Sequence, residues 1–191
     1  MARPREFDTD VAVERAMGLF WQLGYQATAM PRLTALLGIG SGSLYAAFGS
    51  KDGLYARALE RYCDGLVAAL DRDMRAGTDI RTALRGLLIT MTTADVADPE
   101  RGCLLVSAVT ERAGHADTVE RVRLTVTAME SVLTEALRRA RARGELSGEH
   151  SPVELARFLT TFIQGIRVMG QARADRAFLE SAVSGALRAL D

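Results

Sequence analysis

The stretch LTALLGIGSGSLYAAFGSKDGLY, residues 33–55, decides the fold of this chain. It holds two short apolar segments joined by the turn Leu37-Gly38-Ile39-Gly40. Gly38 lets the chain reverse without a Cβ clash, and Ile39 can fill the gap between two helices that cross near a right angle. The pattern predicts a helix-turn-helix, whose second helix can enter the major groove of a DNA duplex.

Helical periodicity continues on both sides of this stretch, whereas the apolar–polar alternation of strands is absent. Capping residues mark two of the later starts: Asp98 precedes Pro99, and Ser151-Pro152-Val153-Glu154 is a capping box. We therefore predict an all-α fold of about nine helices, over residues 10–23, 33–38, 42–48, 51–76, 79–94, 99–112, 117–143, 152–170 and 175–190.

Composition narrows the class of protein. The 191 residues are 48% hydrophobic and 25% charged, and the formal net charge of zero excludes a uniformly basic nucleic-acid binder but not a local basic patch. No apolar segment approaches the roughly 20 residues of a membrane helix, and the N-terminus lacks an apolar export signal. Cys63 and Cys103 are expected to be free thiols, so we expect a cytoplasmic protein with no membrane partner.

Three segments carry a family resemblance. GYQAT (residues 24–28), LTALLGI (33–39) and GSLYAAFGSKDGL (42–54) resemble the DNA-binding domain of tetracycline-repressor-type (TetR/AcrR) transcriptional regulators. The resemblance implies a homodimeric repressor that binds a palindromic operator and is released by a small molecule bound in the C-terminal domain. We accordingly expect a helix-turn-helix domain over residues 1–50 and a helical ligand-binding and dimerisation domain over residues 51–191.

The same resemblance implies which residues touch DNA, mainly at phosphates: Thr28, Ser41, Ser43, Tyr45 and Lys51. Hydroxyl groups and a helix N-terminus suit phosphate oxygens. Ala29 stands where the family usually has a small hydroxyl residue, and Arg32 can supply the missing contact. Because the recognition helix has few long side chains, we expect methyl contacts and DNA shape to carry specificity at Gly42 and Ala46.

Other residues near this domain have two interpretations. Arg3 and Arg5 form either a basic arm that reaches DNA or a solvated tail. Phe48 is interpreted as core, and Tyr45 as partly core with a hydroxyl that reaches the surface.

A ligand pocket is expected among the helices of residues 51–143, lined by apolar side chains with a few polar groups. The candidates are Leu66, Leu88, Met91, Cys103, Val106, Thr110, Met129 and Phe162. Ordinary core packing explains most of these positions equally well, and no charged cluster in the sequence demands a ligand of one charge.

Cys103 carries an alternative function. The segment Gly102-Cys103-Leu104-Leu105-Val106, followed by Glu111, resembles a branch of the family that includes electrophile and oxidant sensors. A cysteine near a helix N-terminus has a lowered pKa, and its thiolate is the reactive form. The other interpretation is a buried thiol that acts as a small hydrophobic side chain.

The last two predicted helices carry wide apolar faces, which the resemblance places in a four-helix dimer interface. The candidates are Leu155, Leu159, Phe162, Ile166, Phe178, Ala182, Val183 and Ala186. The alternative is that both faces belong to the core of one chain.

An enzyme is not expected. The sequence has no nucleophile elbow and no phosphate-binding glycine loop. Cys63, Cys103, His115 and His150 lack metal-ligand spacing, so we expect neither metal nor cofactor. A helical adaptor that only binds other proteins is the remaining class.

Overall fold

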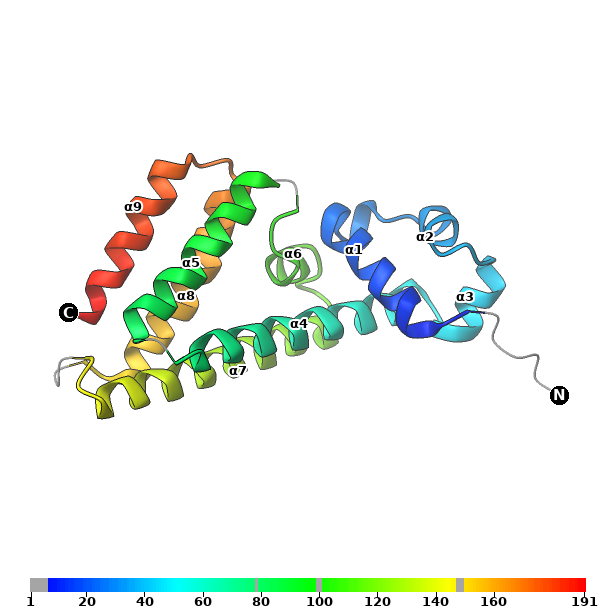
Figure 1. Cartoon of the computed structure of the whole chain (residues 1–191). Coiled ribbons are helices and arrows are strands. Elements are labelled where there is room, and N and C mark those ends of the chain that lie inside the picture. Colours follow the sequence, from blue (N-terminus) through cyan, green and yellow to red (C-terminus); the bar gives the residue numbers. More distant parts are fainter. Residues whose placement is uncertain (1–6, 78, 99–100, 147–149) are drawn as a thin grey trace. The chain divides into compact units, whose positions relative to one another are not determined.

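The computed structural model describes residues 7–77, 79–98, 101–146 and 150–191, and in these ranges every regular element is a helix (Figure 1). The predicted all-α fold is therefore confirmed. The elements are α1 (Thr9–Ala27), α2 (Met30–Leu37), α3 (Ser41–Phe48), α4 (Lys51–Arg75), α5 (Ile80–Ala97), α6 (Leu104–Glu111), α7 (Ala116–Ala142), α8 (Pro152–Gln171), α9 (Arg176–Leu187) and the short 3₁₀ helix η1 (Arg188–Leu190).

Side-chain caps start several of these helices. The carboxylate of Asp8 accepts from the backbone N–H groups of Asp10 and Val11, and that of Asp79 accepts from Thr82 at 2.9 Å. The predicted capping residue Ser151 accepts from Glu154. Such caps satisfy N–H groups that the first turn of a helix leaves without a partner.

Two of the differences from the predicted helix boundaries arise at glycines with a positive φ. The helix expected over residues 99–112 begins only at Leu104, because Gly102 takes a left-handed φ of +53°, outside the α-helical range. Pro99, the expected first residue, lies outside the described residues. The first helix was expected to end near Gly24, where φ is +75°; the chain kinks there and α1 resumes to Ala27.

The described residues form two compact units. The first contains the residues up to Asp64 and Leu104–Val122, and the second contains Gly65–Cys103 and Arg123–Asp191. In the first unit α6 packs against α1, although the two are far apart in sequence. The functional boundary expected at residue 50 stays a prediction, since the compact units divide the chain differently.

A small apolar and aromatic core holds the first unit together. Phe20 of α1 is fully buried and lies edge-on to Tyr55 of α4, with ring centroids 5.0 Å apart. Leu33 of α2 and Leu44 of α3 are also fully buried. Each such leucine contributes about 1.5–3 kcal/mol to folding, which fixes α2 and α3 on the scaffold of α1 and α4.

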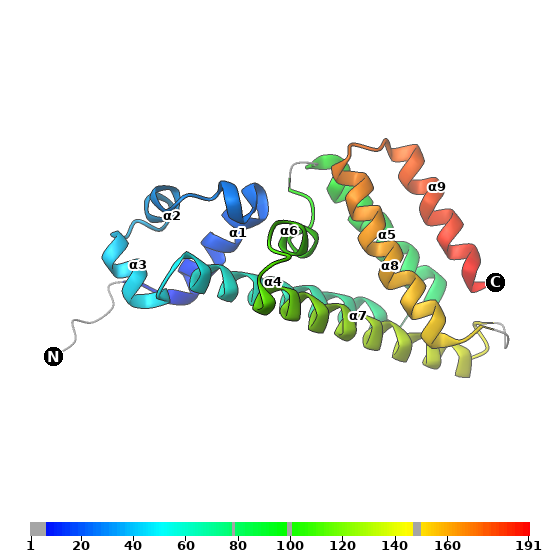
Figure 2. The ribbon, with the colours of Figure 1, turned by 180° about the vertical axis from the view of Figure 1, so that it is seen from behind.

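In the second unit α5, α8 and α9 lie side by side, as both views of the chain show (Figures 1 and 2). Their inward faces form one continuous core that includes Leu84, Leu88, Leu155, Leu159, Ile163, Leu179 and Val183. Among the described residues, no helix combines the length and the apolar character needed to cross a membrane.

Candidate nucleic-acid interface

The predicted helix-turn-helix is formed by α2 and α3. Gly38 ends α2 in the left-handed region, with φ at +66°, and the N–H of Ile39 donates to the carbonyl of Thr34 at 3.2 Å. A residue with a Cβ adopts this backbone conformation at an energetic cost, so glycine suits the turn.

The recognition helix α3 has one buried and one exposed face. Leu44 and Phe48 are buried, which confirms the core interpretation of Phe48. The opposite face is exposed, and Tyr45 has 50% of its surface in solvent. The predicted DNA contacts on this face are Ser41, Gly42, Ser43, Tyr45 and Ala46, and all five are exposed.

Backbone groups add to this surface. Gly40 is the N-cap of α3 and has no side chain to cap the helix, so the first N–H groups of α3 receive no side-chain hydrogen bond from it. Such N–H groups, together with the positive end of the helix dipole, suit a phosphate. The chemistry of a phosphate contact is therefore present at the start of α3.

Lys51 begins α4 and lies against an aromatic ring. Its Nζ is 4.1 Å from the centroid of Tyr25. Partial burial lowers the pKa of Lys51, an effect that the nearby Asp52 opposes. The ring restricts the long, flexible side chain to one region of space.

The two remaining predicted DNA contacts, Arg32 and Thr28, lie outside α3 and α4 and differ from each other in exposure. Arg32 is exposed on α2, as a phosphate contact requires. Thr28 is fully buried, and its hydroxyl donates to the carbonyl of Gly24 at 2.6 Å. The hydroxyl that the resemblance assigns to phosphate therefore closes the kinked end of α1. Arg3 and Arg5 lie outside the described residues.

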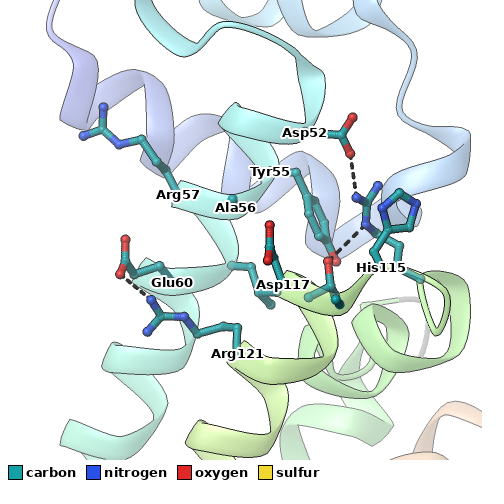
Figure 3. A pocket seen from close by; sticks show the side chains of 12 residues that line it. Asp52, Tyr55, Ala56, Arg57, Glu60, His115, Asp117 and Arg121 are labelled. Atoms are coloured by element: carbon teal, nitrogen blue, oxygen red, sulfur yellow. Dashed lines mark hydrogen bonds and ion pairs between the residues drawn. The ribbon is translucent and has the colours of Figure 1, made fainter.

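The first unit also contains a pocket of about 410 Å³ between α4 and the segment 112–121 (Figure 3). Its charged groups are mostly paired: Arg121 donates to Glu60 at 2.5 Å, and Arg112 donates to Asp52 at 2.5 Å. None of the predicted ligand-binding residues lines this pocket.

The predicted ligand-binding residues divide between the two units. Leu66, Leu88, Met91, Met129 and Phe162 belong to or pack against the core of the second unit. Cys103 is in the second unit and is only 4% exposed, directly before α6. Val106 and Thr110 are in the first unit, and Thr110 is exposed, with its hydroxyl donating to the carbonyl of Val106 at 3.0 Å.

Sequence reasoning missed a buried ion pair in the second unit. Arg167 Nη1 lies 2.5 Å from Asp95 Oδ1, and Asp95 is 3% exposed. Because the two charges cancel, the pair does not demand a ligand of one charge, and that expectation stays a prediction. The two residues are 72 positions apart on α5 and α8, so no local pattern could have linked them.

Most of the predicted dimer interface is instead core of the chain itself. Four of its residues are buried members of the core of the second unit: Leu155, Leu159, Ile166 and Val183. Ala186 is buried as well, and Phe162 and Ala182 are partly buried against this core. Phe178, at 53% exposed, remains available to a partner. The other predicted residues are buried because α5 covers the apolar faces of both α8 and α9.

The described residues were expected to lack a metal site. Among the residues that the structure describes, no three His, Cys, Asp or Glu side chains are grouped to hold an ion. Cys63 and Cys103 are both buried, and neither is part of a disulfide among the residues that the structure describes.

Comparison with known proteins agrees with the geometry of α2 and α3. The family model described as bacterial regulatory proteins, tetR family, matches residues 12–58, and the one described as tetracyclin repressor-like, C-terminal domain, matches residues 84–186. The uncharacterized HTH-type transcriptional regulator YezE of Bacillus subtilis (strain 168) is 30% identical over 195 residues, which cover all of both chains. The HTH-type transcriptional repressor ComR of Escherichia coli (strain K12) is 30% identical over 91% of this chain and 84% of its own.

A solved structure extends the likeness to a DNA complex. It is a cysteine mutant of the TetR family regulator CifR complexed with 26-base-pair double-strand operator DNA; it is 32% identical, with a TM-score of 0.86, and both chains are covered completely. With family models and full-length relatives in agreement, the chain belongs to the TetR family of bacterial regulatory proteins, which are DNA-binding transcriptional regulators and not enzymes.

Proposed function

We propose that this protein is a homodimeric repressor that reads a palindromic operator with α3 and releases it when a small molecule binds the C-terminal domain. The exposed face of α3, set on the buried pair Leu44 and Phe48, is the observation that carries the proposal. Similarity to CifR, solved with its operator, supports it. Its place of action is the cytoplasm, where bacterial operators lie.

Chemistry assigns the roles on this surface. Ser41, Ser43 and the first N–H groups of α3 bind phosphate oxygens, with Lys51 beside them at the start of α4. Tyr45 and Ala46 face the groove, and Arg32 adds a phosphate contact from α2. Because few long side chains are present, specificity depends largely on methyl contacts and DNA shape.

Dimerisation brings two such surfaces to successive major-groove faces, about 34–36 Å apart or a multiple of this. The residues proposed for it are the exposed apolar side chains of α8 and α9: Phe158, Val168, Met169 and Phe178. At Gly165, also exposed on α8, an added Cβ would meet nothing within 4 Å, so a partner helix can approach closely. These residues replace most of those predicted from the sequence.

The test is titration of labelled DNA from upstream of the protein's own gene, followed by fluorescence anisotropy at several salt concentrations. A repressor shifts the specific fragment at lower protein concentration than a scrambled fragment of equal length, and affinity falls steeply with salt. Ser43→Ala and Tyr45→Ala weaken binding, whereas Ser184→Ala, exposed on α9, serves as the matched control. Absence of any preference for the specific fragment, with and without candidate effectors, supports an adaptor instead.

Sensing through Cys103 is the second candidate function, favoured by its position directly before α6. Its burial opposes fast reaction with bulky reagents, so a small electrophile is required. Operator release by an aldehyde or quinone is compared in wild type, Cys103→Ser and Cys63→Ser. Loss of release in Cys103→Ser alone supports this function, and unchanged release in that variant ends it.

A further inference from the structure

The ring of Tyr25, near the end of α1, lies close to two cations from different helical segments. Lys51 Nζ is 4.1 Å from its centroid, and Arg112 Cζ, just after α6, is 3.8 Å from it. Lysine and arginine within about 6 Å of an aromatic centroid are attracted by its quadrupole. Tyr25 therefore connects the residue after α6 to the predicted phosphate contact of α4.

Asp52 ties the same groups together through its carboxylate. Its Oδ1 accepts a hydrogen bond from the Tyr25 hydroxyl at 2.9 Å and one from Arg112 Nη2 at 2.5 Å. Burial favours the protonated carboxyl, but these two hydrogen bonds, together with the positive charges of Arg112 and His115, outweigh it and lower the pKa of Asp52.

Arg112 itself has no access to DNA. It is only 4% exposed, its Nε donates to the hydroxyl of Thr118 at 3.3 Å, and it also lies over the ring of Tyr55. Its Nη1 has no hydrogen-bond partner among the described residues. A guanidinium is planar and weakly hydrated, which suits stacking in such a position better than an ammonium group does.

The neighbouring Glu111 holds the end of α6 in place. Its Oε2 accepts the backbone N–H of Gln26 at 2.9 Å, and its carboxylate occupies the space that a Cβ on Gly24 would need. The end of α6 is thus bound to the end of α1, immediately before the chain enters the helix-turn-helix.

The charges have a consequence for DNA binding. Asp52 is the acidic residue of the first turn of α4 and is adjacent to Lys51. If Arg112 were absent, the Asp52 carboxylate would be free to repel a phosphate or to pair with Lys51, and Lys51 would lose the arrangement of charges around Tyr25.

We propose that Arg112 is a positioning residue for operator binding, which neutralises Asp52 and, through Tyr25, holds Lys51 where it meets a DNA phosphate. This inference rests on the proposed function. On this proposal Arg112 contributes to DNA binding, although it lies within residues 51–191, the range predicted to form the ligand-binding and dimerisation domain.

The experiment measures operator affinity of the full-length protein for wild type, Arg112→Ala, Asp52→Asn, Lys51→Ala and the two double variants that combine Arg112→Ala with each of the others. Arg112→Ala is expected to weaken binding about tenfold, the equivalent of one strong charge-assisted contact. Adding Asp52→Asn recovers at least half of this loss on a logarithmic scale, because it removes the uncovered charge. Adding Lys51→Ala to Arg112→Ala costs much less than Lys51→Ala costs alone, because the two act together.

The matched control is Arg121→Ala, which removes another arginine–carboxylate pair in the same unit, that with Glu60 on the wall of the pocket. It is expected to bind within twofold of wild type. Concentrations are corrected for the DNA-binding fraction, so that a loss of folded protein is not counted as a loss of affinity. Where Arg112→Ala does not fold, Arg112→Lys replaces it, since lysine keeps the charge but cannot stack as a plane.

The outcomes separate the two proposals. If wild type shows no specific binding, the proposed function fails. If wild type binds and the folded Arg112 variant matches it within twofold, or Asp52→Asn recovers nothing and the Lys51 and Arg112 losses simply add, the positioning role of Arg112 is wrong while the repressor assignment stands.

Discussion

Arg167 of α8 lies 2.5 Å from Asp95 of α5, and the same guanidinium donates from Nη2 to the carbonyl of Gly102 at 2.5 Å. One partly buried arginine therefore joins α5, α8 and the residues that lead into α6. Asp95 Oδ2 has no hydrogen-bond partner among the described residues and packs against Gly170, where a Cβ would collide with it. Burial raises the pKa of Asp95 even though Arg167 opposes the shift.

Replacing Arg167 with Met should leave a buried carboxylate without its cation and lower the free energy of unfolding at neutral pH by about 3–5 kcal/mol. Because the folded-state pKa of Asp95 is raised, and rises further without Arg167, the folded variant binds a proton at a pH where the unfolded chain has lost it. The deficit should therefore shrink as the pH falls through the folded-state pKa. Urea unfolding of wild type and variant at several pH values measures it.

The double variant Asp95→Asn/Arg167→Met is the control. It should lose less stability than Arg167→Met alone and show no comparable pH dependence. An equal loss in both variants, or a deficit that does not change with pH, would mean that the uncompensated carboxylate is not the cause.

Gly24→Ala should destabilise the first unit by about 1–3 kcal/mol, because φ of +75° with ψ of 172° is essentially restricted to glycine and Glu111 fills the Cβ position. Gly18→Ala, also in α1, meets nothing within 4 Å and should instead stabilise by about 0.5–1 kcal/mol. Thermal unfolding of the two variants tests the contrast. A Gly24→Ala protein as stable as wild type would contradict the described backbone at the end of α1.

Thr28→Val removes the buried hydroxyl that bonds to Gly24 while keeping most of its volume, so stability should fall by about 1 kcal/mol. The slope of log affinity against log salt for operator binding should stay at the wild-type value. Lys51→Ala should reduce that slope by about 0.9, the change for one lost phosphate contact. A slope for Thr28→Val that falls as far as that for Lys51→Ala would restore the phosphate contact expected from the family resemblance.

Phe178→Glu and Phe158→Glu place a charge on the exposed apolar faces of α9 and α8 and should convert the proposed dimer to a monomer. The measurement is light scattering on a sizing column, with operator affinity determined in parallel. Leu124→Glu, an exposed apolar residue of α7, should leave the mass unchanged. If the wild type is itself a monomer, or if both phenylalanine variants remain dimers, α8 and α9 do not supply the interface.

Local pattern was enough to predict most of the helices and the exposed face of α3. The turn at Gly38 and the three- to four-residue spacing of Leu44 and Phe48 depend on residues close in sequence, so the buried and exposed faces of α3 follow from the chain alone. Capping at Ser151 is equally local. The start of α6 was predicted wrongly because it depends on the left-handed conformation of Gly102. The carbonyl of Gly102 accepts a hydrogen bond from Arg167, which is 65 residues away and leaves no local signal.

By itself the sequence indicated the family through the resemblance of residues 24–54. Its local patterns determined the all-helical class and the exposed face of α3, because period, turn chemistry and capping act within a few residues. Tertiary structure decided which apolar faces of α8 and α9 are buried in the core and which are exposed, since α5 covers the faces that were expected to contact a partner chain. It alone brought Arg112 to Tyr25 and Asp52, and Arg167 to Asp95, because contacts between residues 60 to 90 positions apart leave no periodic pattern in the sequence.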